Sequence, residues 1–566
     1  MRITVTSAAL AIMLCASASL GQSMKPGTAG AYLAARHAAG TNDYRAAAEF
    51  YAQAMRGDSR NFALTENALS ARLALGELRE AEELAARMIG NGSNSQIAHM
   101  AAVAGQTLDQ DFEGLVESFR SATRIGPLVD GLLLGWALIG TGQIEEGIAA
   151  FDAIALRDGL RPFALHHKAL ALAYDGRLEE AEEIFAGKGG VEMPDNRRGL
   201  IARAQILSAL ERNTEARAQI ARVLGSELDV RFSRLDRRLA AGEPLEFTEV
   251  RGAAHGMAEV FYTVSSALNG EASDSYALLY ARIAHALNPN HIDAILLSAE
   301  YLERLDRPEL ATLAYDMVPR GAAEYVTAEL GRADALRAAN RPDAAVEALH
   351  QLAEAHPSIP KIHSKLGDVL RRSGRYAEAV TAYDAAIDLY GAPANEHWFT
   401  YFARGISFER EDNWPAAEAD FRMALELRPN QPQVMNYLGY SLVEKNLKLD
   451  EALELIEAAA QLRPDNGHIL DSLGWVLYRL GRFDEAVGPM ETAVELMATD
   501  PIINDHLGDV YWAVGRFKEA HFQWTRALSF DPEPEDVARI RRKLDVGLDV
   551  VLEEEGMEPI TVANDG

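Results

Sequence analysis

Apolar residues recur along most of the chain at spacings of three and four, which predicts amphipathic helices. In one clear stretch Leu473 and Leu477 lie a helical turn apart, which predicts a helix over residues 471–480. Gly481 follows and favours the left-handed conformation that ends a helix, and a second helix is predicted over residues 484–496. Runs of strand-forming residues are scarce. The pattern therefore predicts an all-α chain built from short helix pairs.

A hinge motif joins the two helices of each pair and returns about every 34 residues. Its clearest form is Gly-Arg-aromatic with an alanine three residues after the aromatic, at residues 374–379, 481–486 and 515–520. The residue at the aromatic position can be followed along the chain as Tyr44, Leu78, Phe112, Ile144, Leu178, Asn213, Pro308, Pro342, Tyr376, Trp414, Leu449, Phe483 and Phe517. This period is the signature of the tetratricopeptide repeat (TPR). We therefore predict an all-α TPR superhelical solenoid of roughly thirteen helix-turn-helix repeats with a C-terminal capping helix.

The hinge rhythm breaks once, near the middle of the chain. The interrupted stretch contains Gly242-Glu243-Pro244, which should break a helix. Its role is open between a flexible connection, a second binding site and a degenerate repeat. The charges of the last helix, Lys543 among them, are expected to form the polar outer face of a cap. The predicted segments are a signal peptide (1–21), an N-terminal TPR array (28–224), a divergent central break (225–256), a C-terminal TPR array (257–532), a capping helix (533–552) and a disordered acidic tail (553–566).

The first residues have the form of a secretory signal peptide. Arg2 precedes a mostly apolar stretch, and small residues follow it up to Gly21. We therefore expect cleavage and a periplasmic protein. The alternative is an outer-membrane lipoprotein anchored through Cys15, although Leu14 is bulky where a lipid-attachment motif has a small residue. As Cys15 is the only cysteine, the chain can form neither an internal disulfide nor a cysteine-based zinc site.

Charge narrows the class of partner. The chain of 566 residues has a formal net charge of −29 and a pI near 4.9. This field repels phosphate backbones and anionic membrane surfaces. We expect no nucleic-acid partner, and a membrane association only if Cys15 carries a lipid.

No catalytic motif stands out. The sequence has no P-loop, no HExxH and no Gly-x-Ser-x-Gly elbow. His166-His167 is the only histidine doublet, and because adjacent helix residues point about 100° apart, we expect a surface pair rather than a metal site. We predict no enzyme activity, no cofactor and no metal.

The C-terminal repeats carry a more specific resemblance. The strings Asn436-Tyr437-Leu438-Gly439-Tyr440, Asp471-Ser472-Leu473-Gly474-Trp475 and His506-Leu507-Gly508-Asp509-Val510 resemble those of proteobacterial cell-envelope TPR proteins. One member of that subgroup is an outer-membrane lipoprotein that acts as an adaptor for a periplasmic carboxyl-terminal processing protease. The resemblance implies an exported scaffold that delivers substrates or partners, and the Leu14-Cys15 pair departs from the lipoprotein pattern.

The resemblance also indicates a binding groove. In family members the residues just after each Leu-Gly pair, and three positions further on, line the concave surface. Carried onto this sequence, those positions hold Tyr440, Trp475, Tyr478, Asp509 and Trp512. The groove candidates also include Asn436, Asp471 and Asp505, which lie earlier on the same helices, and Arg479 nearby. Aromatic residues and arginine are the usual anchors for a partner chain. The other interpretation is that these aromatics only pack the repeats together.

One family binding mode is disfavoured. A clamp for C-terminal carboxylates uses Lys and Asn at groove positions that hold Asp368, Tyr440, Trp475 and Asp509 here. The sequence therefore predicts a non-catalytic scaffold that binds a protein or an extended peptide along its concave face. The alternative is a structural assembly factor for outer-membrane or cell-wall machinery.

Overall fold

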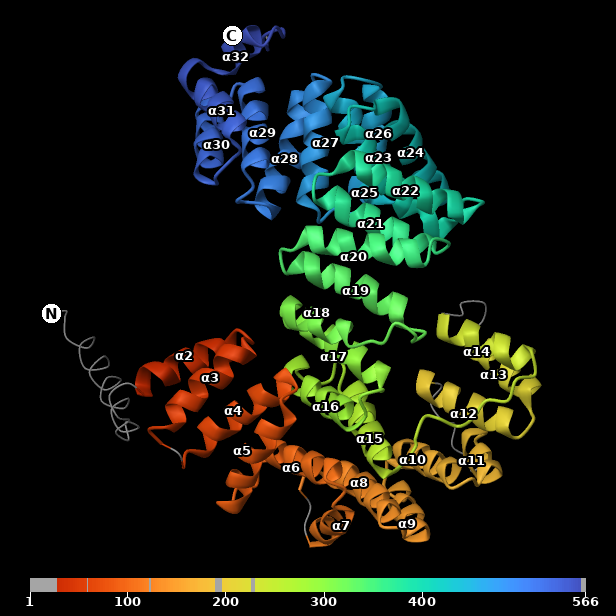
Figure 1. Ribbon diagram of the computed structural model, residues 1–566. Helices are drawn as coiled ribbons and strands as arrows, with labels where there is room; N and C mark the ends of the chain where they lie inside the picture. The colour runs from red at the N-terminus through yellow and green to blue at the C-terminus, as the bar shows by residue number, and fades with distance from the viewer. Residues whose placement is uncertain (1–27, 59, 122–123, 189–195, 225–229, 561–566) are drawn as a thin grey trace, which may run out of the picture. The chain divides into compact units, whose positions relative to one another are not determined.

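The computed structural model describes residues 28–58, 60–121, 124–188, 196–224 and 230–560 (Figure 1). Throughout these ranges the regular structure is helical, without a strand. The chain divides into two compact units, unit 1 over residues 1–348 and unit 2 over residues 349–566. The predicted signal peptide, Cys15 and residues 561–566 lie outside the described residues.

Unit 1 consists of consecutive antiparallel helix pairs with one interruption. Its helices are α2 (Thr28–Gly40), α3 (Tyr44–Met55), α4 (Phe62–Leu75), α5 (Leu78–Gly90), α6 (Gln96–Leu108), α7 (Phe112–Ser121), α8 (Pro127–Gly140), α9 (Ile144–Ala155), α10 (Arg161–Tyr174), α11 (Leu178–Phe185), α12 (Arg197–Ala209), α13 (Asn213–Leu224), α14 (Val230–Ala240), α15 (Ala253–Ala267), α16 (Asp274–Leu287), α17 (Ile292–Arg304), α18 (Pro308–Asp316) and α19 (Tyr325–Ala338). The helix α20 (Pro342–Ala355) spans the division between the units.

Unit 2 continues the same pattern to the C-terminus. Its helices are α21 (Pro360–Arg372), α22 (Tyr376–Tyr390), the 3-10 turn η1 (Asn395–His397), α23 (Trp398–Arg410), α24 (Trp414–Leu427), α25 (Pro432–Glu444), α26 (Leu449–Leu462), α27 (Gly467–Arg479), α28 (Phe483–Leu496), α29 (Pro501–Ala513), α30 (Phe517–Ser529), α31 (Pro534–Val546) and α32 (Leu548–Glu554).

The predicted hinges are confirmed as the joints of the helix pairs. Each residue at the aromatic position, from Tyr44 to Phe517, is the first residue of the second helix of its pair. Gly481 has the expected left-handed backbone, with φ of 74°. The helix predicted to begin at residue 471 begins earlier, because the Asn466 side chain accepts a hydrogen bond from the Ile469 N–H (3.2 Å) and caps the helix there.

Later helices of unit 1 fill the inner surface of its own first repeats. The helices α15 and α16 pack against α4, α6, α8 and α10, which are the first helices of four successive pairs (Figure 1). The Trp136 ring of α8 lies on the backbone of Gly256 in α15, where a Cβ atom would come within 2.1 Å of it. Further along, Arg282 Nε of α16 donates to the carbonyl oxygen of Ala74 in α4 (3.1 Å). An open repeat array leaves its inner surface exposed to a ligand. In unit 1 this surface is instead covered by later helices of the same unit.

The central segment explains how this packing arises. After α14, residues 241–252 run without regular structure along α12. Ser208 Oγ accepts a hydrogen bond from the Leu245 N–H (3.0 Å), and Gln205 Oε1 accepts one from the Thr248 N–H (2.9 Å). The segment thereby leads the chain back so that α15 begins on the inner surface. Within the predicted break, residues 241–252 are thus a crossing between helices that hydrogen bonds hold to α12.

The C-terminal cap differs from its prediction in three respects. It is two helices rather than one, because the chain turns at Gly547, which has φ of +84° and lies against the Trp512 ring. The expected outer polar face is wrong for Lys543, which is fully buried. The tail predicted to be disordered from residue 553 is helical as far as Glu554, and a described segment follows it to Ile560.

Candidate functional site

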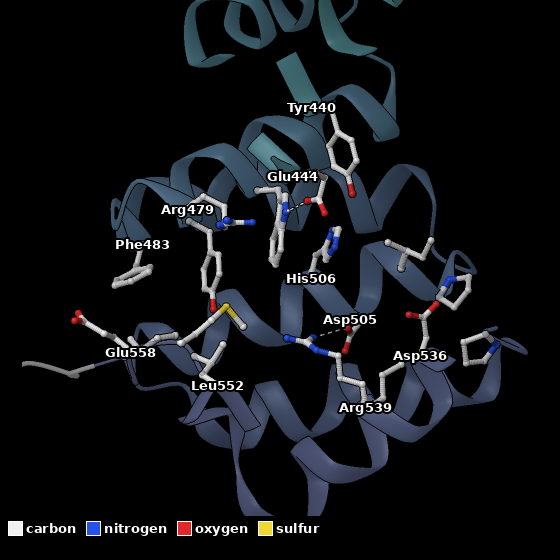
Figure 2. Close-up of a pocket in the computed structure, with 18 residues that line it drawn as sticks. Tyr440, Glu444, Arg479, Phe483, Asp505, His506, Asp536, Arg539, Leu552 and Glu558 are labelled. Atoms are coloured by element: carbon white, nitrogen blue, oxygen red, sulfur yellow. Dashed lines mark hydrogen bonds and ion pairs between the residues drawn. The ribbon is translucent and has the colours of Figure 1, made fainter. Parts of the chain in front are cut away.

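A cavity of about 520 Å³ opens within unit 2 between the first helices of three successive repeats and the cap (Figure 2). The helices α25, α27 and α29 form one wall, while α31, α32 and residues 557–560 form the other. The lining residues are Tyr440, Glu444, Trp475, Tyr478, Arg479, Phe483, Pro501, Ile502, Asp505, His506, Pro532, Asp536, Arg539, Ile540, Leu552, Met557, Glu558 and Ile560.

The repeat wall is built around a stack of rings. Trp475 lies nearly parallel to Tyr478, with ring centroids 4.9 Å apart and planes at 10°, and to His506, at 4.1 Å and 13°. Its indole N–H donates to Glu444 Oε1 (2.8 Å). Since Glu444, Trp475 and His506 come from three different repeats, the stack fixes their helices relative to one another. Trp475 is therefore a structural part of the wall as well as a lining residue.

The surrounding carboxylates favour the charged form of His506. Its Nδ1–H donates to Asp471 Oδ1 (3.0 Å). Burial opposes the imidazolium form, but Asp471 and the neighbouring carboxylates outweigh it, so the pKa of His506 is raised above its ordinary value. The imidazolium then lies against the face of Trp475, an arrangement that a ring quadrupole stabilises.

A buried ion cluster ties the cap to the repeat wall. Lys543 Nζ lies 2.7 Å from Asp505 Oδ2, and 2.6 and 2.8 Å from the two carboxylate oxygens of Asp509. Asp509 Oδ1 also accepts from the Trp524 indole N–H (2.9 Å), and Arg539 lies 3.5 Å from Asp509. Burial is the main cause that raises the pKa of Asp505, against the opposing effect of Lys543. The cap is thus held by paired charges that water does not reach.

Several polar groups of the cavity are left available to a ligand. Within the part of the chain that the structure describes, neither Arg479 nor Asp536 forms an ion pair or a side-chain hydrogen bond, and Asp505 Oδ1 is buried without a hydrogen-bond partner. Figure 2 shows Arg479 and Asp536 on opposite sides of the cavity. The apolar part of the lining includes Ile502 and Leu552. The cavity therefore offers a ligand the Arg479 cation, the Asp536 carboxylate and an apolar lining.

The structure brings five of the nine groove candidates into this cavity. Tyr440, Trp475, Tyr478, Arg479 and Asp505 line it. The other four candidates do not line it, and they are Asn436, Asp471, Asp509 and Trp512.

Three of those four are engaged in contacts elsewhere in unit 2. Asp471 is buried under His506, and Asp509 is buried against Lys543. The Trp512 indole N–H donates to Asp549 Oδ2 (3.0 Å), so the cap covers the position. Asn436 has a buried Oδ1 atom without a hydrogen-bond partner.

Sequence reasoning missed the residues that complete the cavity. Glu444 and His506 lie on the predicted helices, and His506 follows Asp471 by 35 residues, close to one repeat period. That spacing is a signal that could have found His506. Asp536 and Arg539 belong to the cap, where the hinge motif is absent and no repeat position marks the inward face.

A second charged cluster lies inside unit 1. Arg198 Nε is 2.9 and 2.8 Å from the two oxygens of Glu259, and its other nitrogens lie 3.0 Å from Glu249 and 2.9 Å from Asp293. Arg231 adds a contact of 3.1 Å with Asp293. Arg198 and Glu259 are both nearly inaccessible to water. The cluster joins α12, the central segment, α15 and α17, and its groups are already paired with one another.

The prediction that His166-His167 is a surface pair is wrong. Both side chains are buried, because α10 faces α15 rather than solvent. His167 Nδ1 accepts from the Trp136 indole N–H (3.1 Å), and burial lowers the pKa of His167 to about 3. His166 Nε2 lies 3.7 Å from Glu259 Oε1. The two histidines therefore belong to the packed interior of unit 1.

Two properties of the described residues bear on other functions. No group of three or more His, Cys, Asp or Glu side chains within them is placed to hold a metal ion. None of the helices described here combines the length and the apolar character needed to cross a membrane.

Comparison with known proteins identifies tetratricopeptide repeats in part of the chain. The tetratricopeptide repeat family model matches residues 330–394, 402–466 and 444–501. A TPR repeat-containing protein of Pseudomonas aeruginosa is 28% identical over 160 residues, which is 28% of this chain and 26% of the relative. The chain thus matches only about a quarter of that relative's length.

Solved structures give weaker likenesses. MamA of Desulfovibrio magneticus is 20% identical and covers 30% of this chain and 94% of its own, with a TM-score of 0.28. The Cut9–Hcn1 hetero-tetramer of APC/C is 12% identical and covers 92% and 97%, with a TM-score of 0.38. The hinged helix pairs and the family matches between residues 330 and 501 show that this part of the chain contains tetratricopeptide repeats, and the chain is similar to proteins of that family.

Proposed function

We propose that this chain is a non-catalytic adaptor that binds an extended peptide segment of a partner protein in the cavity of unit 2. The observation that carries the proposal is the unpaired Arg479 and Asp536 on opposite sides of a cavity with an aromatic and apolar lining. Repeat folds of this kind usually serve as binding surfaces.

The chemistry of the cavity suits a peptide better than a small metabolite. Tyr440 and Ile502 offer apolar area to alternate side chains, while the buried Asp505 Oδ1 can accept a hydrogen bond from a backbone N–H. Arg479 suits an acidic side chain or a terminal carboxylate, and Asp536 suits a basic one. An extended segment with opposite charges on its two flanks would satisfy all of these groups at once.

Export and the identity of the partner extend this proposal. We propose that residues 1–21 direct the chain to the periplasm, on the basis of the charged start, apolar stretch and small residues described above. The outer-membrane lipoprotein remains the alternative. The resemblance of the C-terminal repeats supports a carboxyl-terminal processing protease as the partner to which substrates are delivered.

A peptide selection tests the binding proposal. Peptides are selected by display on the purified chain, and their affinities are then measured for Ile502→Asp and for Phe522→Asp. Both side chains are exposed apolar residues of unit 2, at 50% and 61%, but only Ile502 lines the cavity. A loss of about tenfold or more is expected for Ile502→Asp alone, since a charge replaces apolar contact area. Equal affinities for the two variants would place binding elsewhere.

A crosslinking pull-down from envelope extracts tests the finer claims. The native chain is expected to recover a processing protease, and the Ile502→Asp and Arg479→Ala variants are expected to lose it. Mass measurement of the mature chain in cell fractions tests export. A chain that keeps its first 21 residues in the cytoplasm contradicts the proposed location.

A further inference from the structure

The cavity contains a part of the chain's own C-terminus. After α32 the backbone reverses at Gly556, with φ of +75°, and residues 556–560 (here named the strap) run back along the cavity. Met557, Glu558 and Ile560 of the strap are lining residues, and Figure 2 shows Glu558 at the edge of the cavity.

The strap is attached by few contacts. The Met557 N–H donates to the Leu552 carbonyl (2.8 Å) and the Ile560 N–H donates to Asp549 Oδ1 (3.0 Å). Ile560 is the one half-buried side chain of the strap and packs against the cluster that contains Tyr478 and Leu552, while Met557 is 47% exposed. A segment with so little buried area opens at low cost in free energy.

The wall beneath the strap is held far more firmly. Lys543 and Arg539 fix α31 to Asp505 and Asp509 through buried or half-buried charges. Displacement of the strap would therefore leave the repeat wall and α31 in place and would enlarge the opening beside Tyr478 and Leu552.

We propose that the strap is a displaceable internal competitor of the partner peptide. We also infer the chemistry of that peptide from the strap, which reads Met557, Glu558, Pro559 and Ile560. The peptide is expected to carry an acidic residue followed by a proline, with an apolar residue on each side of this pair. This inference rests on the proposed function of the cavity. A partner with this chemistry takes over the contacts of the strap and gains those of the repeat wall.

Nested truncations test the competition. One chain ends after Glu555 and lacks the strap, and its matched control ends after Ile560 and keeps it. Peptides selected by display on the shorter chain are expected to bind it about fivefold to tenfold more tightly than the control, because the closed strap reduces the competent fraction. The full chain with Ile560→Ser is a second way to release the strap, which leaves α32 uncut and has the same expected gain.

A peptide added in trans tests the chemistry. The probe is the acetylated peptide of residues 555–560, observed by broadening of its NMR lines. A tethered tail has an effective concentration in the millimolar range. If the closed state of the strap is about tenfold more populated than the open state, the same peptide added in trans is expected to bind with a Kd of about 0.1–1 mM. Broadening is expected with the chain that ends after Glu555, and at least about fivefold less with its control. A peptide with serine in place of the methionine and the isoleucine should not broaden.

The outcomes separate the two proposals. Display peptides that bind both truncated chains with equal affinity overturn the competition and leave the peptide-binding function intact. Selected peptides that lack the acidic and proline positions, together with no binding of the 555–560 peptide, overturn the inferred chemistry. Failure of any peptide to bind either chain overturns the proposed function and this inference together.

Discussion

Lys543 is the side chain on which attachment of the cap depends. It contacts both carboxylates that α29 turns toward the cap, and it has no access to water. A buried ammonium group between two carboxylates is stabilising only while all three charges are present, because removal of one leaves the others without water or partner.

The substitution Lys543→Met is expected to destabilise unit 2 by about 3–5 kcal/mol, since it removes the buried ammonium group and leaves Asp505 and Asp509 with only the more distant Arg539 as a cation. Urea unfolding of the full chain, with hydrogen exchange in α29 and α31, measures the loss. Arg541→Met on the exposed side of the same helix is the control and should change stability by less than about 0.5 kcal/mol. A similar loss for both variants would show that the paired charges are not the cause.

The pair of His506 and Asp471 makes a pH-dependent contribution. The pKa of His506 is raised in the folded state, so its stabilisation is fully present below the unfolded pKa of about 6.5 and is lost as the pH rises through the folded-state pKa. Asp471→Asn is therefore expected to cost about 1–2 kcal/mol at pH 5.5 and less at pH 9. Chemical unfolding at the two pH values checks the sign. A cost that grows toward pH 9 would contradict a raised pKa.

Repeat position predicts which residues share a face but not what covers that face. Tyr440 and Trp475 stand at equivalent positions of successive repeats and both line the cavity. Trp512 occupies the position equivalent to Tyr478, which also lines the cavity, yet Trp512 is covered because Gly547 and Asp549 of the cap lie against it. Since the cap has no repeat signature, neither its inward residues nor its effect on Trp512 could be predicted from the sequence.

At the scale of the helix pair, one backbone conformation recurs at every joint. The left-handed residue that ends the first helix is glycine at positions 76, 142, 176, 374, 481 and 515, and a residue with a side chain at others, such as Asn42, Gln110 and Glu211. Glycine and asparagine tolerate this conformation, whereas other L-residues adopt it at a cost of about 1 kcal/mol. The hinge therefore persists where its sequence signature has weakened.

Substitution at two neighbouring hinges tests this cost. Glu211→Gly is expected to stabilise its repeat by about 0.5–1 kcal/mol, because φ of +64° strains glutamate more than glycine. Gly176→Ala, at φ of +84° and with no atom in the way of a Cβ, is expected to destabilise by about 1 kcal/mol. Hydrogen exchange in α10 to α13 measures both effects. Effects of the same sign at both sites would rule out backbone strain as their source.

The helix pairs could be predicted because each is specified by nearby residues, such as Gly481 and Phe483. The crossing over residues 241–252 could not, because Ser208 and Gln205, which pin it, lie about 40 residues earlier and form no motif with it. Long-range hydrogen bonds of this kind leave no periodic trace in a single sequence.

At the scale of the whole molecule, unit 1 and unit 2 are built from the same kind of repeat but differ in what covers its inner surface. In unit 1 the inner surface is filled by α15 and α16, and Trp136 and Gly256 form its tightest contact. In unit 2 the corresponding surface is closed only by the cap, which leaves the cavity open. The difference is the reason why the proposed binding site lies in unit 2.

The close contact in unit 1 makes a specific prediction. Gly256→Ala is expected to cost about 2–3 kcal/mol, because the added methyl would lie 2.1 Å from the Trp136 ring unless α15 moves. In the background of Trp136→Leu the same change should cost at least about 1 kcal/mol less. A double-mutant cycle by urea unfolding measures this coupling. Strict additivity would mean that α15 does not pack against α8 in solution.

The filled inner surface also limits how such a protein can evolve. An open solenoid can gain or lose a repeat at small cost, because each repeat contacts only its neighbours. In unit 1 the bond from Arg282 to Ala74 joins residues 208 positions apart. Insertion of one repeat between them would displace every later inner helix from its partner. The number of repeats before the crossing at residues 241–252 is therefore fixed by this packing. Variation in length among descendants of such a chain is therefore expected in unit 2, on the amino-terminal side of the cavity.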